Sequence, residues 1–195
     1  MADPLYLSLW FPSFDEEEIL PRTLSVLAQF PFSAARPGVS SVTIQPVSWS
    51  EATVLERRFN PGIEPAEAVA IAADLLHADY AYLFEAYWDL WSPDETGKWV
   101  LQPSQVKFIA HGVEFEEGTY QEVGHIQVDF GLDAPFLFEE RALGEVEQRV
   151  KANIHKLVTF TAAVEKSSGI RGRVLWSESQ ENLAQKLIAR LQGTQ

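Results

Sequence analysis

Residues 80–91 read YAYLFEAYWDLW, which is the strongest strand signal in the chain. One alternate set of side chains is almost wholly apolar: Tyr80, Tyr82, Phe84, Ala86, Trp88 and Leu90. The other set mixes carboxylates with apolar and aromatic groups: Ala81, Leu83, Glu85, Tyr87, Asp89 and Trp91. Alternation with a period of two is typical of a strand that buries one face. We therefore expect a long central strand here, spanning roughly 40 Å at about 3.3 Å per residue.

Shorter elements precede this strand. Ser13 and Glu16 are spaced as a capping box for a helix, and Pro21 should cause either a kink or a restart of that helix. A second helix is expected over residues 65–77. Strands are expected over residues 5–11, 39–49 and 52–59, the last two forming a hairpin. The order strand, helix, strand, strand, helix, strand is that of the ferredoxin-like βαββαβ unit. The sequence thus predicts a ferredoxin-like first half over residues 1–91.

The second half, residues 98–195, shows the order strand, strand, helix, strand, helix. Its expected strands cover 99–115, interrupted at Pro103, then 124–131 and 173–176; its helices cover 144–166 and a last segment capped by Ser177 and Gln180. We therefore predict an α+β protein with about four helices and one or more mixed or antiparallel sheets. The two halves either pack as separate units or form one compact domain, and the alternative of a single extended sheet of seven or eight strands stays open.

Composition indicates a folded, soluble protein. Of its 195 residues, 46% are hydrophobic and 12% aromatic, which supplies ample surface for a core. The chain lacks cysteine, so disulfides, thiolate metal sites and cysteine nucleophiles are excluded. No apolar run reaches the roughly 18 residues that a membrane helix needs, and no basic residue precedes the first apolar stretch as in a secretory signal. We expect a cytoplasmic protein without membrane contact.

Charge is unevenly distributed along the chain. The formal net charge is −13, and residues 1–97 contribute fifteen acidic side chains against four arginines. This asymmetry predicts one acidic face, which would repel phosphate backbones and attract a basic partner. We therefore expect no nucleic acid among its partners and consider a basic protein partner, with a homodimer as a further hypothesis. The simpler interpretation is that the charge only maintains solubility.

His111 and His125 form the best candidate metal site, with Glu114 and Asp129 nearby in sequence. Imidazole and carboxylate groups suit zinc, manganese or iron. The two histidines can meet only if their strands are neighbours in register, and His125 and Asp129 lie about 13 Å apart along one strand. The simpler interpretation is that these are polar strand residues facing solvent.

The mixed face of residues 80–91 suggests a ligand site. Glu85 and Asp89 flank Tyr87, and Trp91 follows on the same face. Aromatic rings beside carboxylates bind sugars or organic cations. Arg57 is a candidate partner for Glu85 if the hairpin lies beside the long strand. The alternative is a partly exposed face with a structural ion pair.

Sequence motifs for catalysis are lacking. The chain has no Gly-x-Gly-x-x-Gly fingerprint, no phosphate-binding loop and no Gly-x-Ser-x-Gly elbow. We predict no catalytic residue and no cofactor. The favoured hypothesis is a non-catalytic interaction protein, inhibitor-like or immunity-like, that presents an acidic face. The alternative is an enzyme or small-ligand binder with an aromatic and carboxylate cleft on a sheet face.

Overall fold

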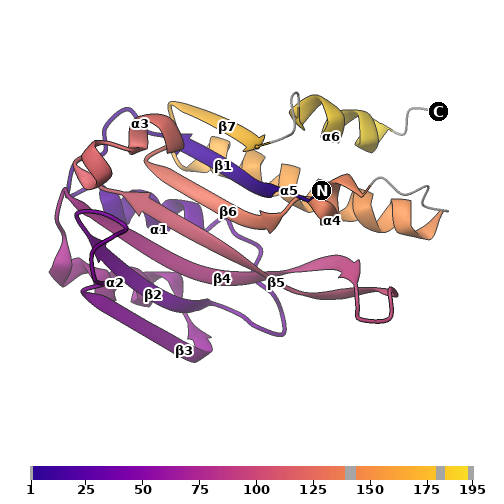
Figure 1. Ribbon diagram of the computed structural model, residues 1–195, viewed down its shortest axis with the longest axis horizontal. Helices are drawn as coiled ribbons and strands as arrows, with labels where there is room; N and C mark the ends of the chain where they lie inside the picture. Colours follow the sequence, from indigo (N-terminus) through magenta and orange to yellow (C-terminus); the bar gives the residue numbers. More distant parts are fainter. Residues whose placement is uncertain (1, 139–143, 179–182, 193–195) are drawn as a thin grey trace.

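One antiparallel sheet organises the chain in the computed structural model, which describes residues 2–138, 144–178 and 183–192 (Figure 1). Its seven strands are β1 (Pro4–Trp10), β2 (Val39–Pro46), β3 (Leu55–Ile63), β4 (Tyr80–Pro93), β5 (Trp99–His111), β6 (Ile126–Leu132) and β7 (Gly172–Ser177). The helices in the described residues are α1 (Ile19–Leu27), α2 (Pro65–Ala72), α3 (Tyr120–Val123), α4 (Ala134–Leu137), α5 (Glu145–Ser167) and α6 (Leu183–Gln192), with short 3₁₀ turns η1 (Ala73–Leu75) and η2 (Phe115–Glu117). The predicted α+β class is confirmed, with more helices than the four expected.

The strand order is β3-β2-β4-β5-β6-β1-β7, and every neighbouring pair is antiparallel. The ferredoxin-like order predicted for the first half is not confirmed, because β1 pairs with β6 and β7 rather than with strands of its own half. The physical reason is that β1 buries Leu5, Leu7 and Leu9 completely between two neighbours that lie far away in sequence. Strands from both halves thus share one sheet, and the division into units 1–91 and 98–195 stays a prediction.

The core lies between one face of the sheet and the helices α1, α2 and α5, which cover that face in Figure 1. The apolar set predicted for β4 is confirmed as its core face: Tyr82, Phe84, Ala86, Trp88 and Leu90 are buried. The mixed set on the opposite face, from Leu83 to Trp91, is half-buried. Among the described helices, none is both long and apolar enough to cross a membrane.

Several element boundaries differ from the sequence prediction. Helix α1 begins at Ile19, and the Ser13 hydroxyl donates to Glu18 Oε1 at 2.9 Å instead of capping a helix. Pro21 therefore lies in the first turn, where its missing N–H needs no intrahelical partner. Of the two outcomes expected at Pro21, the kink is unnecessary, because the helix starts only two residues before the proline. Strand β5 continues through Pro103, since β6 pairs only with Lys107–Ala110 and leaves the proline on an edge. The predicted cap of the last helix at Ser177 and Gln180 falls partly outside the described residues.

Candidate functional site

Five chain segments meet at the end of the sheet where β1, β2 and β5 stop. They are residues 11–18, 47–54, 73–79, 112–125 and 168–171, at the left of Figure 1. Backbone hydrogen bonds join some of them: Val47 N–H donates to the Asp79 carbonyl at 2.8 Å, and Glu116 N–H to the Val47 carbonyl at 2.9 Å. Together they contain eleven carboxylates and one arginine, so they account for −10 of the formal charge of −13. We call these five segments the acidic end.

Most carboxylates of the acidic end are open to solvent. Those with exposed side chains are Asp15, Glu16, Glu17, Glu51, Asp74, Glu114, Glu117 and Glu122. Glu18 is half-buried, and hydrogen bonding from Ser13, with help from Arg22, keeps the pKa of its carboxyl below the usual value. Trp49 lies among these groups with 46% of its surface exposed, and its ring packs edge-on against Phe115 at 5.0 Å. The acidic end therefore combines a strong negative field with an exposed aromatic side chain.

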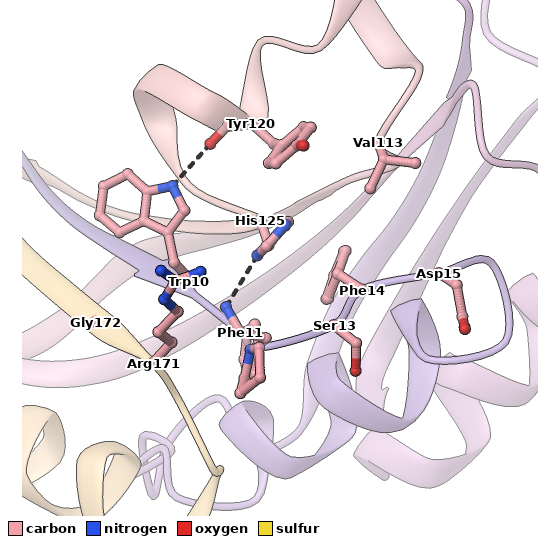
Figure 2. A pocket seen from close by; sticks show the side chains of 11 residues that line it. Trp10, Phe11, Ser13, Phe14, Asp15, Val113, Tyr120, His125, Arg171 and Gly172 are labelled. Carbon is pink, nitrogen blue, oxygen red and sulfur yellow. Dashed lines mark hydrogen bonds between the residues drawn. The ribbon is translucent and has the colours of Figure 1, made fainter.

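A cavity of about 640 Å³ opens at the same end (Figure 2). Its wall comes from the end of β1 and the loop after it, from the 112–125 segment, and from the residues that enter β7. The lining residues are Trp10, Phe11, Pro12, Ser13, Phe14, Asp15, Val113, Tyr120, His125, Arg171 and Gly172. This volume lies in the range of small-molecule binding sites, and a wall of mainly apolar and aromatic side chains with a few polar groups is typical of them.

His125 is the central polar group of this cavity. Its ring is stacked between Tyr120, with centroids 4.6 Å apart, and Phe14, with centroids 4.7 Å apart. Its Nδ1 accepts the Phe11 backbone N–H at 2.9 Å, so in the neutral ring the proton sits on Nε2. Burial lowers the pKa of His125 to about 4, and the ring is therefore uncharged at neutral pH. Figure 2 shows the second ring nitrogen turned away from Phe11.

Backbone geometry fixes the position of His125. Gly124 adopts φ +98°, and a Cβ there would lie 2.8 Å from the Leu9 backbone nitrogen, so only glycine fits between β1 and β6. The Trp10 indole N–H donates to the Tyr120 carbonyl at 3.0 Å, which ties β1 to α3. Arg171 N–H donates to the Trp10 carbonyl at 2.7 Å and brings the start of β7 to the cavity.

The two histidines of the predicted metal site are neighbours, as that prediction required. The His111 backbone N–H donates to the His125 carbonyl at 2.8 Å. In each ring, however, Nδ1 is already hydrogen-bonded to the backbone: His111 Nδ1–H donates to the Gly124 carbonyl, and His125 Nδ1 accepts the Phe11 N–H. Burial lowers the pKa of His111 to about 4. Within the described residues, no group of three or more His, Cys, Asp and Glu side chains is arranged to hold a metal ion. Metal binding by His111 and His125 stays a prediction without a third ligand.

The predicted ligand set on β4 is divided among separate structural contacts. Glu85 accepts the Ser41 hydroxyl at 2.9 Å, Asp89 accepts the Ser33 hydroxyl at 2.6 Å, and the guanidinium groups of Arg36 and Arg149 lie over the rings of Tyr87 and Trp91 at 3.7 and 4.8 Å. Arg57 is exposed on β3, opposite Val42, and β2 separates it from Glu85. None of these five candidates lines the cavity of Figure 2.

Sequence reasoning singled out one residue of this cavity, His125, and missed Trp10, Phe14, Tyr120 and Arg171. The available signal was the run Trp10–Phe14, in which three aromatic residues surround a proline immediately after a predicted strand. Such rings at a strand end are as common in cores as in sites, so the run alone does not indicate a cavity.

Comparison with known proteins adds no assignment: no family model matches the sequence, and neither curated proteins nor solved structures give a significant match. Function must therefore be inferred from the geometry of the acidic end and its cavity.

Proposed function

We propose that this chain is a non-catalytic binding protein that docks its acidic end on a basic protein partner, as an inhibitor or immunity protein does. The observation that carries the proposal is the gathering of eleven carboxylates and one arginine in five neighbouring segments. A formal charge of −10 at one end creates a directed field, which speeds the encounter with a positive surface and orients it.

Trp49 would supply an apolar contact with the partner in addition to the attraction between charges. Interfaces owe most of their binding energy to a few residues, and tryptophan is prominent among them. Trp49 is 46% exposed, and its backbone N–H donates to Glu116 Oε1 at 2.9 Å, which holds its segment against the acidic 112–125 segment. A basic partner with an apolar pocket among its cations would complement this surface.

The proposal is tested by selecting ligands without bias from a random library of displayed twelve-residue peptides. The selected peptides are expected to be rich in lysine and arginine and to contain a hydrophobic residue. Amide shifts of the ¹⁵N-labelled protein should then change in the five segments of the acidic end. Affinity should fall steeply with added salt, because screening weakens attraction between exposed charges.

A matched pair of variants distinguishes the effect on binding of charge at the acidic end from the effect of total net charge. The triple variant Glu114→Gln, Glu117→Gln and Glu122→Gln removes three exposed carboxylates from the acidic end and should weaken peptide binding by about tenfold. The control, Glu64→Gln, Glu67→Gln and Glu95→Gln, makes the same change in net charge at exposed positions near the other end of the sheet. Selected peptides without net positive charge, or equal losses in both variants, would contradict the proposal.

The alternative function, an enzyme or small-ligand binder with a cleft over β4, has weaker support. The contacts of Glu85, Tyr87, Asp89 and Trp91 with four different neighbours give these side chains structural roles.

The homodimer and the cytoplasmic location stay predictions. Sedimentation of the purified chain at several concentrations tests the homodimer directly.

A further inference from the structure

We propose that the cavity of Figure 2 binds an uncharged, planar aromatic molecule that presents a hydrogen-bond acceptor to His125. This site goes beyond the proposed function, because it uses the buried wall between β1 and α3 rather than the exposed carboxylates.

His125 carries a hydrogen-bond donor that no described residue uses. His125 is only 7% exposed, and its Nδ1 is taken by the Phe11 N–H. His125 lines the cavity, and no hydrogen-bond partner for its Nε2–H occurs among the described residues. The Nε2 atom is open to solvent, because the fully buried side-chain polar atoms without a partner in that part of the chain belong to Trp88 and Ser168. A ligand acceptor at this point would therefore replace solvent at the Nε2–H, which supplies the polar contact that orients a ligand in an otherwise largely apolar wall.

Aromatic side chains shape the wall of the cavity around His125. Tyr120 and Phe14 lie on the two faces of the His125 ring, and Trp10 is held beside them by its hydrogen bond to Tyr120. Aromatic side chains fixed in this way favour a flat ring that stacks or packs edge-on. The Trp10 and His125 side chains are both hydrogen-bonded to backbone groups, so the cavity is largely pre-formed and less entropy is lost when a ligand binds.

The charges around the cavity determine which kind of ligand it favours. Asp15 and Arg171 both line the cavity and offset each other, but the surrounding acidic end carries a formal −10. That field disfavours an anion. A guanidinium or ammonium group is attracted by the field, yet it has no lone pair for the Nε2–H of His125. A neutral acceptor, such as an amide or ring carbonyl, meets both conditions.

Three fragments of nearly equal shape test this selectivity: benzamide, benzoate and benzamidine. They present the same ring with a neutral acceptor, an anionic acceptor and a cationic donor. Benzamide is expected to shift the amide signals of residues 11–15, 120–125 and 171–172 and the ¹⁵N signal of His125 Nε2. Its affinity should be in the millimolar range, as for other fragments, and about fivefold or more above that of the other two.

Variants locate the site. His125→Phe keeps a ring between Tyr120 and Phe14 but removes the donor, and benzamide affinity should fall by about fivefold. His155→Phe makes the same substitution at an exposed position of α5 and should leave binding unchanged. If His125→Phe fails to fold, Tyr120→Leu removes one aromatic wall and should also weaken benzamide binding.

Three results would overturn this site: tightest binding of benzamidine, wild-type affinity in the folded His125→Phe protein, or no fragment-induced shifts in the cavity segments. The triple glutamine variant of the acidic end should bind benzamide like the wild type, because the fragment is uncharged. Failure of the peptide experiment and failure of the fragment experiment are therefore distinguishable.

Discussion

At the scale of single residues, the buried histidines make stability depend on pH. The pKa values of His111 and His125 are lowered to about 4, chiefly by burial, while an unfolded histidine titrates near 6.5. The unfolded chain therefore takes up protons first as the pH falls, and stability is lost between pH 6.5 and pH 4. Between pH 7.5 and pH 5 the loss should be about 2 kcal/mol for each ring. Urea unfolding at constant ionic strength measures it, and His125→Phe should reduce the slope while His155→Phe should not.

Gly124 is the second residue on which the site depends. Alanine at this position would keep φ at +98° and place its Cβ 2.8 Å from Leu9 N and 3.0 Å from Leu9 O, both backbone atoms of a central strand. We expect Gly124→Ala to lower the free energy of unfolding by about 2–4 kcal/mol. Gly131→Ala is the matched control, since Gly131 also has a positive φ, of +78°, but a Cβ there meets nothing within 4 Å. Its cost should be about 1 kcal/mol, and equal losses in both variants would refute the steric explanation.

At the scale of elements, α5 supplies hydrogen-bond partners to the part of β4 that does not pair with β2. Asn153 donates through Nδ2 to the carbonyls of Trp91 and Pro135 and accepts the Trp91 N–H through Oδ1. Asn153→Ala leaves these partly buried groups without their partner and should cost about 2–4 kcal/mol in urea unfolding, with faster hydrogen exchange at the Trp91 amide. His155→Ala on the exposed side of the same helix should change stability by less than about 0.5 kcal/mol. Unchanged exchange at Trp91 would show that α5 is not held by this residue.

Elements with strong periodicity could be predicted from the sequence, and their neighbours could not. The core face of β4 follows from alternation over residues 80–91, a property of the strand itself. The partners of β1 lie more than a hundred residues away, and nothing within residues 4–10 specifies β6 or β7. The same holds for the cavity, because Trp10, Tyr120, His125 and Arg171 meet only through that long-range pairing. The sequence indicates His125 only as part of a possible metal site with His111, Glu114 and Asp129, and its stacking between Tyr120 and Phe14 depends on tertiary structure.

At the scale of the whole molecule, the position of β1 links the two halves of the chain. Leu5, Leu7 and Leu9 are fully buried between β6 and β7, and β4 pairs along its length with β5. Expressed as separate fragments, residues 1–97 and 98–195 should each lack a cooperative thermal transition and a near-ultraviolet circular dichroism signal. Fragment 1–97 exposes the leucines of β1 and one edge of β4, and fragment 98–195 has no strand between β6 and β7.

Mixing the two fragments should restore the fold and both proposed sites together. The acidic end takes three of its segments from the first fragment and two from the second, and the cavity places Trp10 and Phe14 from one against Tyr120 and His125 from the other. Near-ultraviolet circular dichroism and peptide binding should therefore recover in parallel as the fragments are titrated to equal amounts. A cooperative transition in either isolated fragment would instead show that this half is an independent domain. Peptide binding by an isolated fragment would show that the acidic end does not require the shared sheet.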